Sequence, residues 1–383
     1  MKVFHGARLF DGERFFDDHA LVVEGGAIRA LVDFVDRPLG GETFDLGGGV
    51  LSPGFVDWQV NGGGGVLFNA EPTVDAIARI AHAHRREGVT GFLPTVVTDA
   101  PDVLASALTA ARKAHVRVPG ALGVHVEGPF IDPSRKGVHP AEYIRPMREK
   151  DAGALIAMRA GVMVVTLAPA SVPLELVRRL ADAGIVVSLG HSDATAEEAS
   201  AVFDAGARAA THLFNAMSQL HSRAPGVVGA ALADSRVVCG LIADGEHVHP
   251  AACRAAFAAK GPGGIALISD AMPPAAGGPD TFEMQGRRMT RVGNRLVDEN
   301  GALAGAAITL REAVRYATLT LGLPLASALT MATLTPARLL GLDGRIGRLA
   351  AGFAADLVHL TEALDVAGVW VDGKGVQEAD ERA

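Results

Sequence analysis

The sequence contains little cysteine. Cys239 and Cys253 are the only two among 383 residues. Two cysteines cannot build a disulfide framework, and these two lack the spacing of a metal-binding motif. We therefore expect a protein that folds in a reducing compartment without disulfide bonds.

Basic residues and long apolar runs are also in short supply. The chain has 35 Lys and Arg against 43 Asp and Glu, which gives a formal net charge of −8 at pH 7. Nucleic acids and anionic membranes attract basic surfaces, so neither is an expected partner. No run of about 18 uncharged apolar residues could span a membrane, and residues 1–8 have no apolar core of the signal-peptide type. A soluble, cytoplasmic protein is expected.

The residues that remain are mostly small and apolar. Hydrophobic residues make up 49% of the chain and charged ones 20%, whereas aromatics make up only 5%. This composition is sufficient for a large core and excludes disorder for most of the chain. The abundance of Ala, Gly and Val suits close packing of helices on a sheet.

Short apolar runs alternate with amphipathic helical patterns from about Pro53 onward. The runs are rich in Val, Ile and Leu, as is typical of parallel strands buried on both faces. Eight such runs separated by helices predict a (β/α)8 TIM-like barrel, with a doubly wound open sheet as the alternative. The runs are residues 54–60, 92–97, 122–126, 163–167, 185–189, 209–213, 237–242 and 265–269.

The two ends of the chain differ from this pattern. Residues 1–52 and 348–383 have the pattern of short strands separated by turns, including Asp372-Gly373 as a hairpin signal. Neither end has enough apolar residues for a core of its own. We expect them to combine into one small β-sandwich domain beside a barrel of residues 53–347. Paired strands are also expected within residues 281–297.

Four ionisable residues follow four different predicted strands: Glu127, His191, His212 and Asp270. Barrel enzymes place their active residues at these strand ends. One carboxylate and two imidazoles are the usual protein ligands of an open catalytic Zn²⁺ or Fe²⁺ site. Such a metal lowers the pKa of its bound water to about 7, and Asp270 could accept and return the proton.

The other histidines and the glycine-rich segment favour structural roles. A histidine at a strand end is more often a hydrogen-bonded loop residue than a ligand. His125 shares the strand face of Glu127, so it is expected one layer deeper. His82 and His84 are expected on the solvated face of a helix. Residues 61–65 lack the Lys-Ser/Thr of a phosphate-binding loop and are interpreted as a flexible loop.

Several segments occur in an order that is known from one protein family. Together they resemble the N-acetylglucosamine-6-phosphate deacetylase family of the amidohydrolase superfamily, and the resemblance spans nearly the whole chain. Residues 344–356 resemble the superfamily's return into its small β-domain. The segments are Pro53-Gly54-Phe55-Val56-Asp57, His125-Val126-Glu127-Gly128-Pro129-Phe130, Gly190-His191-Ser192-Asp193-Ala194-Thr195, Thr211-His212-Leu213-Phe214-Asn215-Ala216-Met217 and Ser269-Asp270-Ala271.

The resemblance implies a metal-dependent hydrolase that converts N-acetyl-D-glucosamine 6-phosphate into D-glucosamine 6-phosphate and acetate. It implies that Glu127, His191 and His212 bind one divalent metal per subunit, expected to be Zn²⁺ with Fe²⁺ as the alternative. Asp270 then corresponds to the general base and acid, and His139 to a catalytic histidine at the substrate carbonyl.

The resemblance also implies a set of substrate-binding residues and a homodimer. Within the set, Arg223 and His247 correspond to residues near the phosphate, and either could reach the site of a neighbouring subunit. The set is Val138, His139, Asn215, Ala216, Arg223, His247, Leu303, Ala304 and Gly305.

The end of the first barrel strand departs from the pattern of many amidohydrolases, which carry His-x-His there. This chain has Gln59-Val60-Asn61. Gln and Asn are poor Zn²⁺ ligands compared with imidazole, so one tightly held metal is predicted. The alternatives are another amidohydrolase acting on a cyclic amide or an N-acyl amino acid, a non-catalytic sugar-phosphate sensor, and a metal-free structural barrel.

Overall fold

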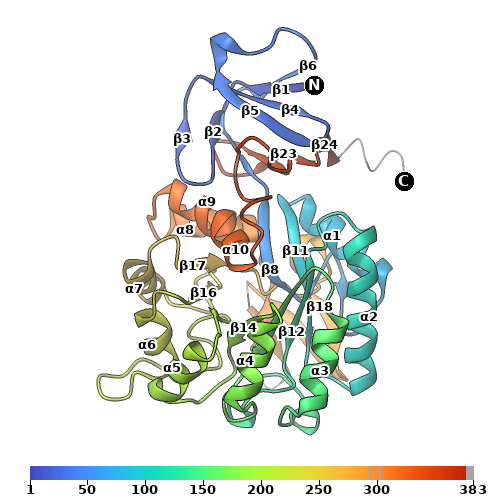
Figure 1. Ribbon diagram of the computed structural model, residues 1–383, viewed down its shortest axis with the longest axis vertical. Helices are drawn as coiled ribbons and strands as arrows, with labels where there is room; N and C mark the ends of the chain where they lie inside the picture. The colour runs from blue at the N-terminus through green and yellow to red at the C-terminus, as the bar shows by residue number, and fades with distance from the viewer. Residues whose placement is uncertain (294, 300, 302, 377–383) are drawn as a thin grey trace.

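The computed structural model describes residues 1–293, 295–299, 301 and 303–376. Its largest sheet has eight parallel strands in the order β17-β16-β15-β14-β13-β12-β11-β8, with helices around the outside (Figure 1). Each strand overlaps one of the predicted apolar runs. The strands are β8 (Phe55–Val60), β11 (Val89–Val97), β12 (Gly123–Glu127), β13 (Val162–Leu167), β14 (Val186–Leu189), β15 (Ala209–Ala210), β16 (Val238–Leu241) and β17 (Ile265–Leu267).

The sheet closes on itself between its first and last strands. Val60, at the end of β8, forms a parallel bridge with Ala271, which follows β17. One layer deeper, the backbone N–H of Ser269 donates to the Asp57 carboxylate at 3.3 Å. Because a doubly wound sheet would leave these two edges apart, the barrel prediction is confirmed.

Helices follow the strands and bury small side chains against them. Ala107, Ala111 and Ala114 of α2 are fully or almost fully buried, which lets this helix lie close to the sheet. The N-terminus of α1 is capped by Thr73, whose hydroxyl accepts the N–H of Ala76 at 3.1 Å. The helices are α1 (Val74–Arg85), α2 (Pro101–Arg117), α3 (Glu149–Met158), α4 (Leu174–Asp182), α5 (Ala196–Asp204), α6 (Gly226–Ala233), α7 (Pro250–Lys260), α8 (Leu310–Leu319), α9 (Leu325–Ala332) and α10 (Leu334–Leu339), with 3-10 turns at η1 (Phe34–Asp36), η2 (Pro133–Arg135), η3 (Ala141–Tyr143) and η4 (Ala275–Gly277).

Both ends of the chain meet in two small sheets at one end of the barrel (Figure 1). The sheets have the orders β5-β4-β1-β6 and β24-β23-β22-β7-β2-β3. Phe4 stacks on Phe44 at 4.8 Å and meets Trp370 edge-on at 5.0 Å between ring centroids. The predicted small β-domain is confirmed, although residues 377–383 of it lie outside the described residues. Its strands are β1 (Lys2–His5), β2 (Arg8–Phe10), β3 (Phe15–Phe16), β4 (His19–Glu24), β5 (Ala27–Asp33), β6 (Glu42–Asp45), β7 (Val50–Pro53), β22 (Leu357–Leu360), β23 (Val366–Val371) and β24 (Lys374–Gly375).

A four-stranded antiparallel sheet follows the last barrel strand, as predicted. Its Met284 and Met289 pack in one buried cluster with Val97, at the end of β11, and with Met272. This places the inserted sheet at the rim of the barrel where the catalytic candidates lie. Its strands are β18 (Thr281–Met284), β19 (Arg287–Val292), β20 (Arg295–Asp298) and β21 (Leu303–Ala306), and a short hairpin of β9 (Gly62–Gly63) and β10 (Val66–Leu67) lies nearby.

Within the described part of the chain, no helix combines the length and the apolar character that a membrane span requires.

Replacing Gly123 by alanine should destabilise the strand that carries Glu127. Gly123 has a φ of +155°, and a Cβ there would lie 1.8 Å from the carbonyl oxygen of Val162, its partner on β13. Forced backbone strain of this kind costs roughly 1–3 kcal/mol. Thermal unfolding should therefore show a lower Tm for Gly123→Ala. Gly263→Ala is the control, because a Cβ at Gly263 meets nothing within 4 Å. Equal Tm values for the two variants would contradict the argument.

Candidate metal centre and active site

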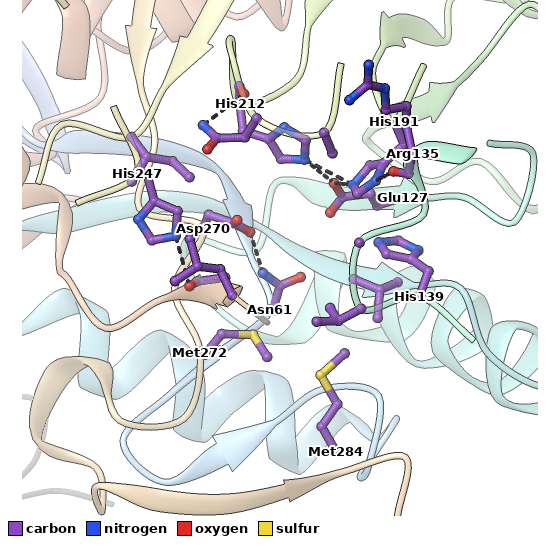
Figure 2. Close-up of a pocket in the computed structure, with 18 of the residues that line it drawn as sticks. Asn61, Glu127, Arg135, His139, His191, His212, His247, Asp270, Met272 and Met284 are labelled. Carbon is purple, nitrogen blue, oxygen red and sulfur yellow. Dashed lines mark hydrogen bonds and ion pairs between the residues drawn. The ribbon is translucent and has the colours of Figure 1, made fainter. Parts of the chain in front are cut away.

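Three predicted metal ligands meet at the rim of the barrel (Figure 2). One carboxylate oxygen of Glu127, Oε1, lies 3.1 Å from Nε2 of His191 and 2.9 Å from Nε2 of His212. The two imidazole nitrogens are 3.1 Å apart, and all three residues are buried. The side chains come from the ends of β12, β14 and β15, so the barrel brings together residues that lie far apart in the sequence.

His139 lies beside this cluster as a fourth imidazole. Glu127, His139 and His191 each offer a ligand atom within 4.8 Å of one another. His212 is closer still, at 2.9 and 3.1 Å from Glu127 and His191, so it is the better third ligand. Nδ1 of His139 is 2.7 Å from the Thr98 hydroxyl, which leaves Nε2 for the cavity. Burial lowers the pKa of His139 well below its usual range, so the ring is neutral at pH 7.

The protein fixes the orientation of His191. Its Nδ1 lies 2.9 Å from the carbonyl oxygen of Arg135. A carbonyl only accepts, so Nδ1 donates there, and Nε2 is directed at Glu127 as the ring atom that could coordinate a metal. The carbonyl acts here as the outer partner that a metal-binding histidine usually has.

The electrostatics of the cluster also suit a cation. Burial alone would raise the pKa of Glu127, but its contacts with His191 and His212 outweigh burial and hold that pKa well below the usual range. For His212 burial acts to lower the pKa, and the Glu127 carboxylate raises it overall. Without a metal, Glu127 therefore draws a proton to its neighbour. A divalent cation would replace that proton.

Three of the candidate metal-binding and catalytic residues have strained backbones. His191, His212 and Asp270 have φ values of 47°, 32° and 48°. Positive φ is uncommon outside glycine and recurs at functional sites, where surrounding structure maintains it. Each of these residues follows a barrel strand, and the backbone turns there as the chain leaves the sheet.

Asp270 is held by two carboxamides from the end of β8. Its Oδ1 accepts from Nε2 of Gln59 at 3.1 Å and from Nδ2 of Asn61 at 2.6 Å. The same Gln59 nitrogen donates to Oε2 of Glu127 at 3.1 Å. Burial, reinforced by the charge of Glu127, raises the pKa of Asp270 to about 6. The carboxyl group can thus accept a proton at neutral pH and release it again.

A cavity of about 370 Å³ opens beside these groups. It is lined by all four strand-end residues and by most of the predicted substrate-binding set. Ala304 is buried outside the lining, and Arg223 is exposed on the segment before α6. The predicted residues that line the cavity are Glu127, Val138, His139, His191, His212, Asn215, Ala216, His247, Asp270, Leu303 and Gly305.

His247 is held by a carboxylate that the sequence interpretation missed. Nδ1 of His247 lies 2.6 Å from Oδ2 of Asp244, and Nε2 lies 3.1 Å from the carbonyl oxygen of Gly305. Burial acts to lower the pKa of His247, but Asp244 raises it overall. Asp244 thus stabilises the cationic form of the imidazole, whose two nitrogens both face acceptors of the protein. Asp244 follows β16, so the same strand-end argument could have identified it.

Two structural predictions near the site are wrong. His84 is not solvated: it is fully buried in α1, and its Nε2 lies 2.9 Å from the carbonyl oxygen of Gly62. The segment 61–65 forms part of a hairpin where a flexible loop is predicted, because Gly62 and Gly63 pair with residues 66–67 as strands β9 and β10. His84 therefore supports the hairpin that follows Asn61. His125 lies in the core as predicted, with Nε2 2.7 Å from the Thr166 hydroxyl.

The comparison with known proteins agrees with this geometry. The sequence profile of the Amidohydrolase family matches residues 50–376. The chain belongs to the amidohydrolase family. The resemblance noted from its motifs is thereby confirmed at the level of the family.

Individual relatives are similar over almost their whole length. The chain is 38% identical to N-acetylgalactosamine-6-phosphate deacetylase of Shewanella sp. (strain ANA-3), covering 100% of this chain and 97% of the relative. It is 37% identical to N-acetylglucosamine-6-phosphate deacetylase of Haemophilus influenzae, covering 93% and 94%. The crystal structure of the N-acetylglucosamine-6-phosphate deacetylase from Pasteurella multocida matches with a TM-score of 0.95 at 34% identity, covering 98% and 99%.

Replacing Glu127 by glutamine should abolish tight metal binding. The carboxamide keeps the size of the side chain but removes the only anion that contacts both His191 and His212 among the described residues. Even residues that only orient metal ligands are worth 10–100-fold in metal affinity, so a direct ligand should cost at least roughly tenfold. Elemental analysis of purified protein measures the loss. Glu142→Gln, at an exposed position, is the control. Equal metal content in both variants would remove Glu127 from the metal site.

Proposed function

We propose that this chain hydrolyses the acetamide of N-acetyl-D-glucosamine 6-phosphate to D-glucosamine 6-phosphate and acetate. One observation carries the proposal: Glu127, His191 and His212 contact one another and line the same cavity as the Asp270 carboxylate. The names of the relatives support it. A mutant of the N-acetyl-D-glucosamine-6-phosphate deacetylase from Mycobacterium smegmatis was solved in complex with N-acetyl-D-glucosamine-6-phosphate, and this chain matches it with a TM-score of 0.90 at 31% identity.

The donor set fits one divalent metal per subunit, proposed as Zn²⁺ with Fe²⁺ as the alternative. Glu127, His191 and His212 would hold it. When bound, such an ion polarises a carbonyl and makes water acidic enough to supply hydroxide near neutral pH. A second ion is disfavoured, because the Gln59 nitrogen already bridges the Glu127 and Asp270 carboxylates.

Asp270 transfers the proton in this proposal. Its carboxylate accepts a proton from the attacking water, and the resulting carboxyl group protonates the amide nitrogen as the C–N bond breaks. The products are then an amine and acetic acid, which ionises to acetate and a proton, with no net change at Asp270. The hydrogen bonds from Gln59 and Asn61 keep the carboxylate in one orientation for both steps.

His139 is proposed to stabilise the negative charge on the carbonyl oxygen. The Thr98 hydroxyl lies 2.7 Å from Nδ1, and a hydroxyl that donates there leaves the proton of the neutral ring on Nε2. An N–H donor at this position acts as one arm of an oxyanion hole. The ring centroid of His139 is 4.4 Å from that of His191. The proposed donor and the proposed metal site therefore face the same part of the cavity.

The remaining cavity residues are proposed to bind the sugar phosphate. His247 favours its cationic form and suits the phosphate, and Val138, Asn215, Ala216, Leu303 and Gly305 line the same cavity. Arg223 is exposed, and we propose that it reaches a phosphate in the neighbouring subunit of a homodimer. Ala304 would act by positioning its neighbours in β21, Leu303 and Gly305, which line the cavity. We also propose that the protein is cytoplasmic. Residues 1–52 and 348–383 are proposed to form the small β-domain, and residues 53–347 the barrel.

The 4-epimer of the sugar is a second candidate substrate, because the Shewanella relative is named as an N-acetylgalactosamine-6-phosphate deacetylase. A cyclic amide or an N-acyl amino acid remains the alternative outside the sugar phosphates.

An assay of acetate release decides between these substrates. Purified protein should release acetate from N-acetyl-D-glucosamine 6-phosphate faster than from the unphosphorylated sugar, and a strong chelator should abolish the activity. N-acetyl-D-galactosamine 6-phosphate, a cyclic amide and an N-acyl amino acid are assayed in parallel. A higher kcat/KM for the galactose epimer would reassign the sugar, and no release from either sugar phosphate would overturn the proposal.

Replacing Asp270 by asparagine should lower kcat by roughly 10²–10⁴-fold, the usual contribution of a general acid or base, while metal content stays normal. In the metal-loaded wild type, kcat/KM should fall on the acid side of pH 6, because Asp270 becomes protonated there and cannot accept a proton. A bound cation stabilises the Asp270 carboxylate and so moves the decline of kcat/KM to lower pH. The exposed Asp182→Asn is the control. A near-normal rate for Asp270→Asn would remove Asp270 from its role.

A further inference from the structure

The side chain of Asn61 has one satisfied end and one unsatisfied end. Its nitrogen, Nδ2, donates to Oδ1 of Asp270 at 2.6 Å. Its oxygen, Oδ1, is buried and has no hydrogen-bond partner among the described residues. The residue is 3% exposed and lines the cavity. Buried acceptors are nearly always paired in native proteins, so this oxygen points to a donor that the protein itself does not supply.

The orientation of this carboxamide is determined by its neighbours. A carboxylate only accepts hydrogen bonds, so the nitrogen must face Asp270 and the oxygen must face away from it. Figure 2 shows the oxygen of Asn61 directed toward the side of the cavity where His139 lies. The backbone is anchored as well: the N–H of Asn61 donates to Ala271 O, and its carbonyl accepts from Phe68 N, both at 2.9 Å. The oxygen therefore occupies a defined position.

We infer that Oδ1 of Asn61 accepts the N–H of the scissile acetamide and so orients the leaving nitrogen toward Asp270. The inference rests on the proposed deacetylation and adds the group that recognises the amide nitrogen. In a trans secondary amide, the N–H points away from the C=O. A carbonyl oxygen directed at Glu127, His191 and His212 thus sends the N–H to the opposite side of the cavity, where Asn61 lies (Figure 2).

One contact then links recognition with proton transfer. The nitrogen that Asn61 holds is the atom that Asp270 must protonate, and Asn61 is hydrogen-bonded to Asp270. An amide offers this N–H, whereas an ester has an oxygen at the same position and offers none. Loss of a hydrogen bond that an active site is built to make can strongly reduce discrimination. The residue should therefore favour amides over esters of the same sugar.

The test compares N-acetyl-D-glucosamine 6-phosphate with 2-O-acetyl-D-glucose 6-phosphate, its ester analogue. Asn61→Leu removes both the donor to Asp270 and the free acceptor. Gln59→Leu is the control: it removes the other donor to Asp270, together with a donor to Glu127, but leaves the Asn61 acceptor in the cavity, which Gln59 itself does not line. Elemental analysis and Tm measurements verify that both variants retain metal and fold.

Asn61→Leu should lower the ratio of amide to ester kcat/KM by roughly tenfold more than Gln59→Leu does, as expected for one hydrogen bond. Asn61→Asp, which keeps an acceptor oxygen, should preserve the ratio while lowering both rates. An equal change of the ratio in Asn61→Leu and Gln59→Leu would overturn the inference, because the effect would then act through Asp270 alone. A wild-type enzyme that hydrolyses no amide would instead overturn the proposed function.

Discussion

The Glu127 carboxylate is the interaction on which the site depends. One of its oxygens faces the Nε2 atoms of His191 and His212, and the other accepts from Gln59. These residues lie far apart in the sequence, and the order of β12, β13, β14 and β15 in the curved sheet brings their side chains within 3.1 Å. A charge buried to this degree is stable because every one of these contacts opposes its desolvation. The position of each partner is thus constrained by the same anion.

The two carboxamides at the end of β8 distinguish this site from one with His-x-His. Both side chains are neutral, so they add no charge to the site: Gln59 links the Glu127 and Asp270 carboxylates, and Asn61 donates to Asp270. The hydrogen bonds of Asp270 come from groups that cannot titrate. Burial and the charge of Glu127 raise the pKa of Asp270, and the hydrogen bond from Asn61 acts to lower it.

Much of the fold could be predicted from the sequence, because the barrel strands are continuous apolar runs and their ends carry polar residues. The positions of Glu127, His191, His212 and Asp270 follow from that rule and from the motif resemblance. His84 shows what a sequence pattern leaves out. The helical pattern identifies the helix that carries His84, but it does not show that the hairpin at Gly62 covers this side of the helix. The positive φ values at the site, and the pairing of Asp244 with His247, depend on contacts across the barrel.

The place of β7 has a consequence for how the molecule is made. This strand lies between β2, from the first ten residues, and β22, which begins at Leu357. On the ribosome the early strands emerge long before their late partner, and the whole barrel is synthesised in between. The N-terminal layer therefore has one edge open until β22 has been synthesised, and an open strand edge in a nascent chain is prone to aggregation.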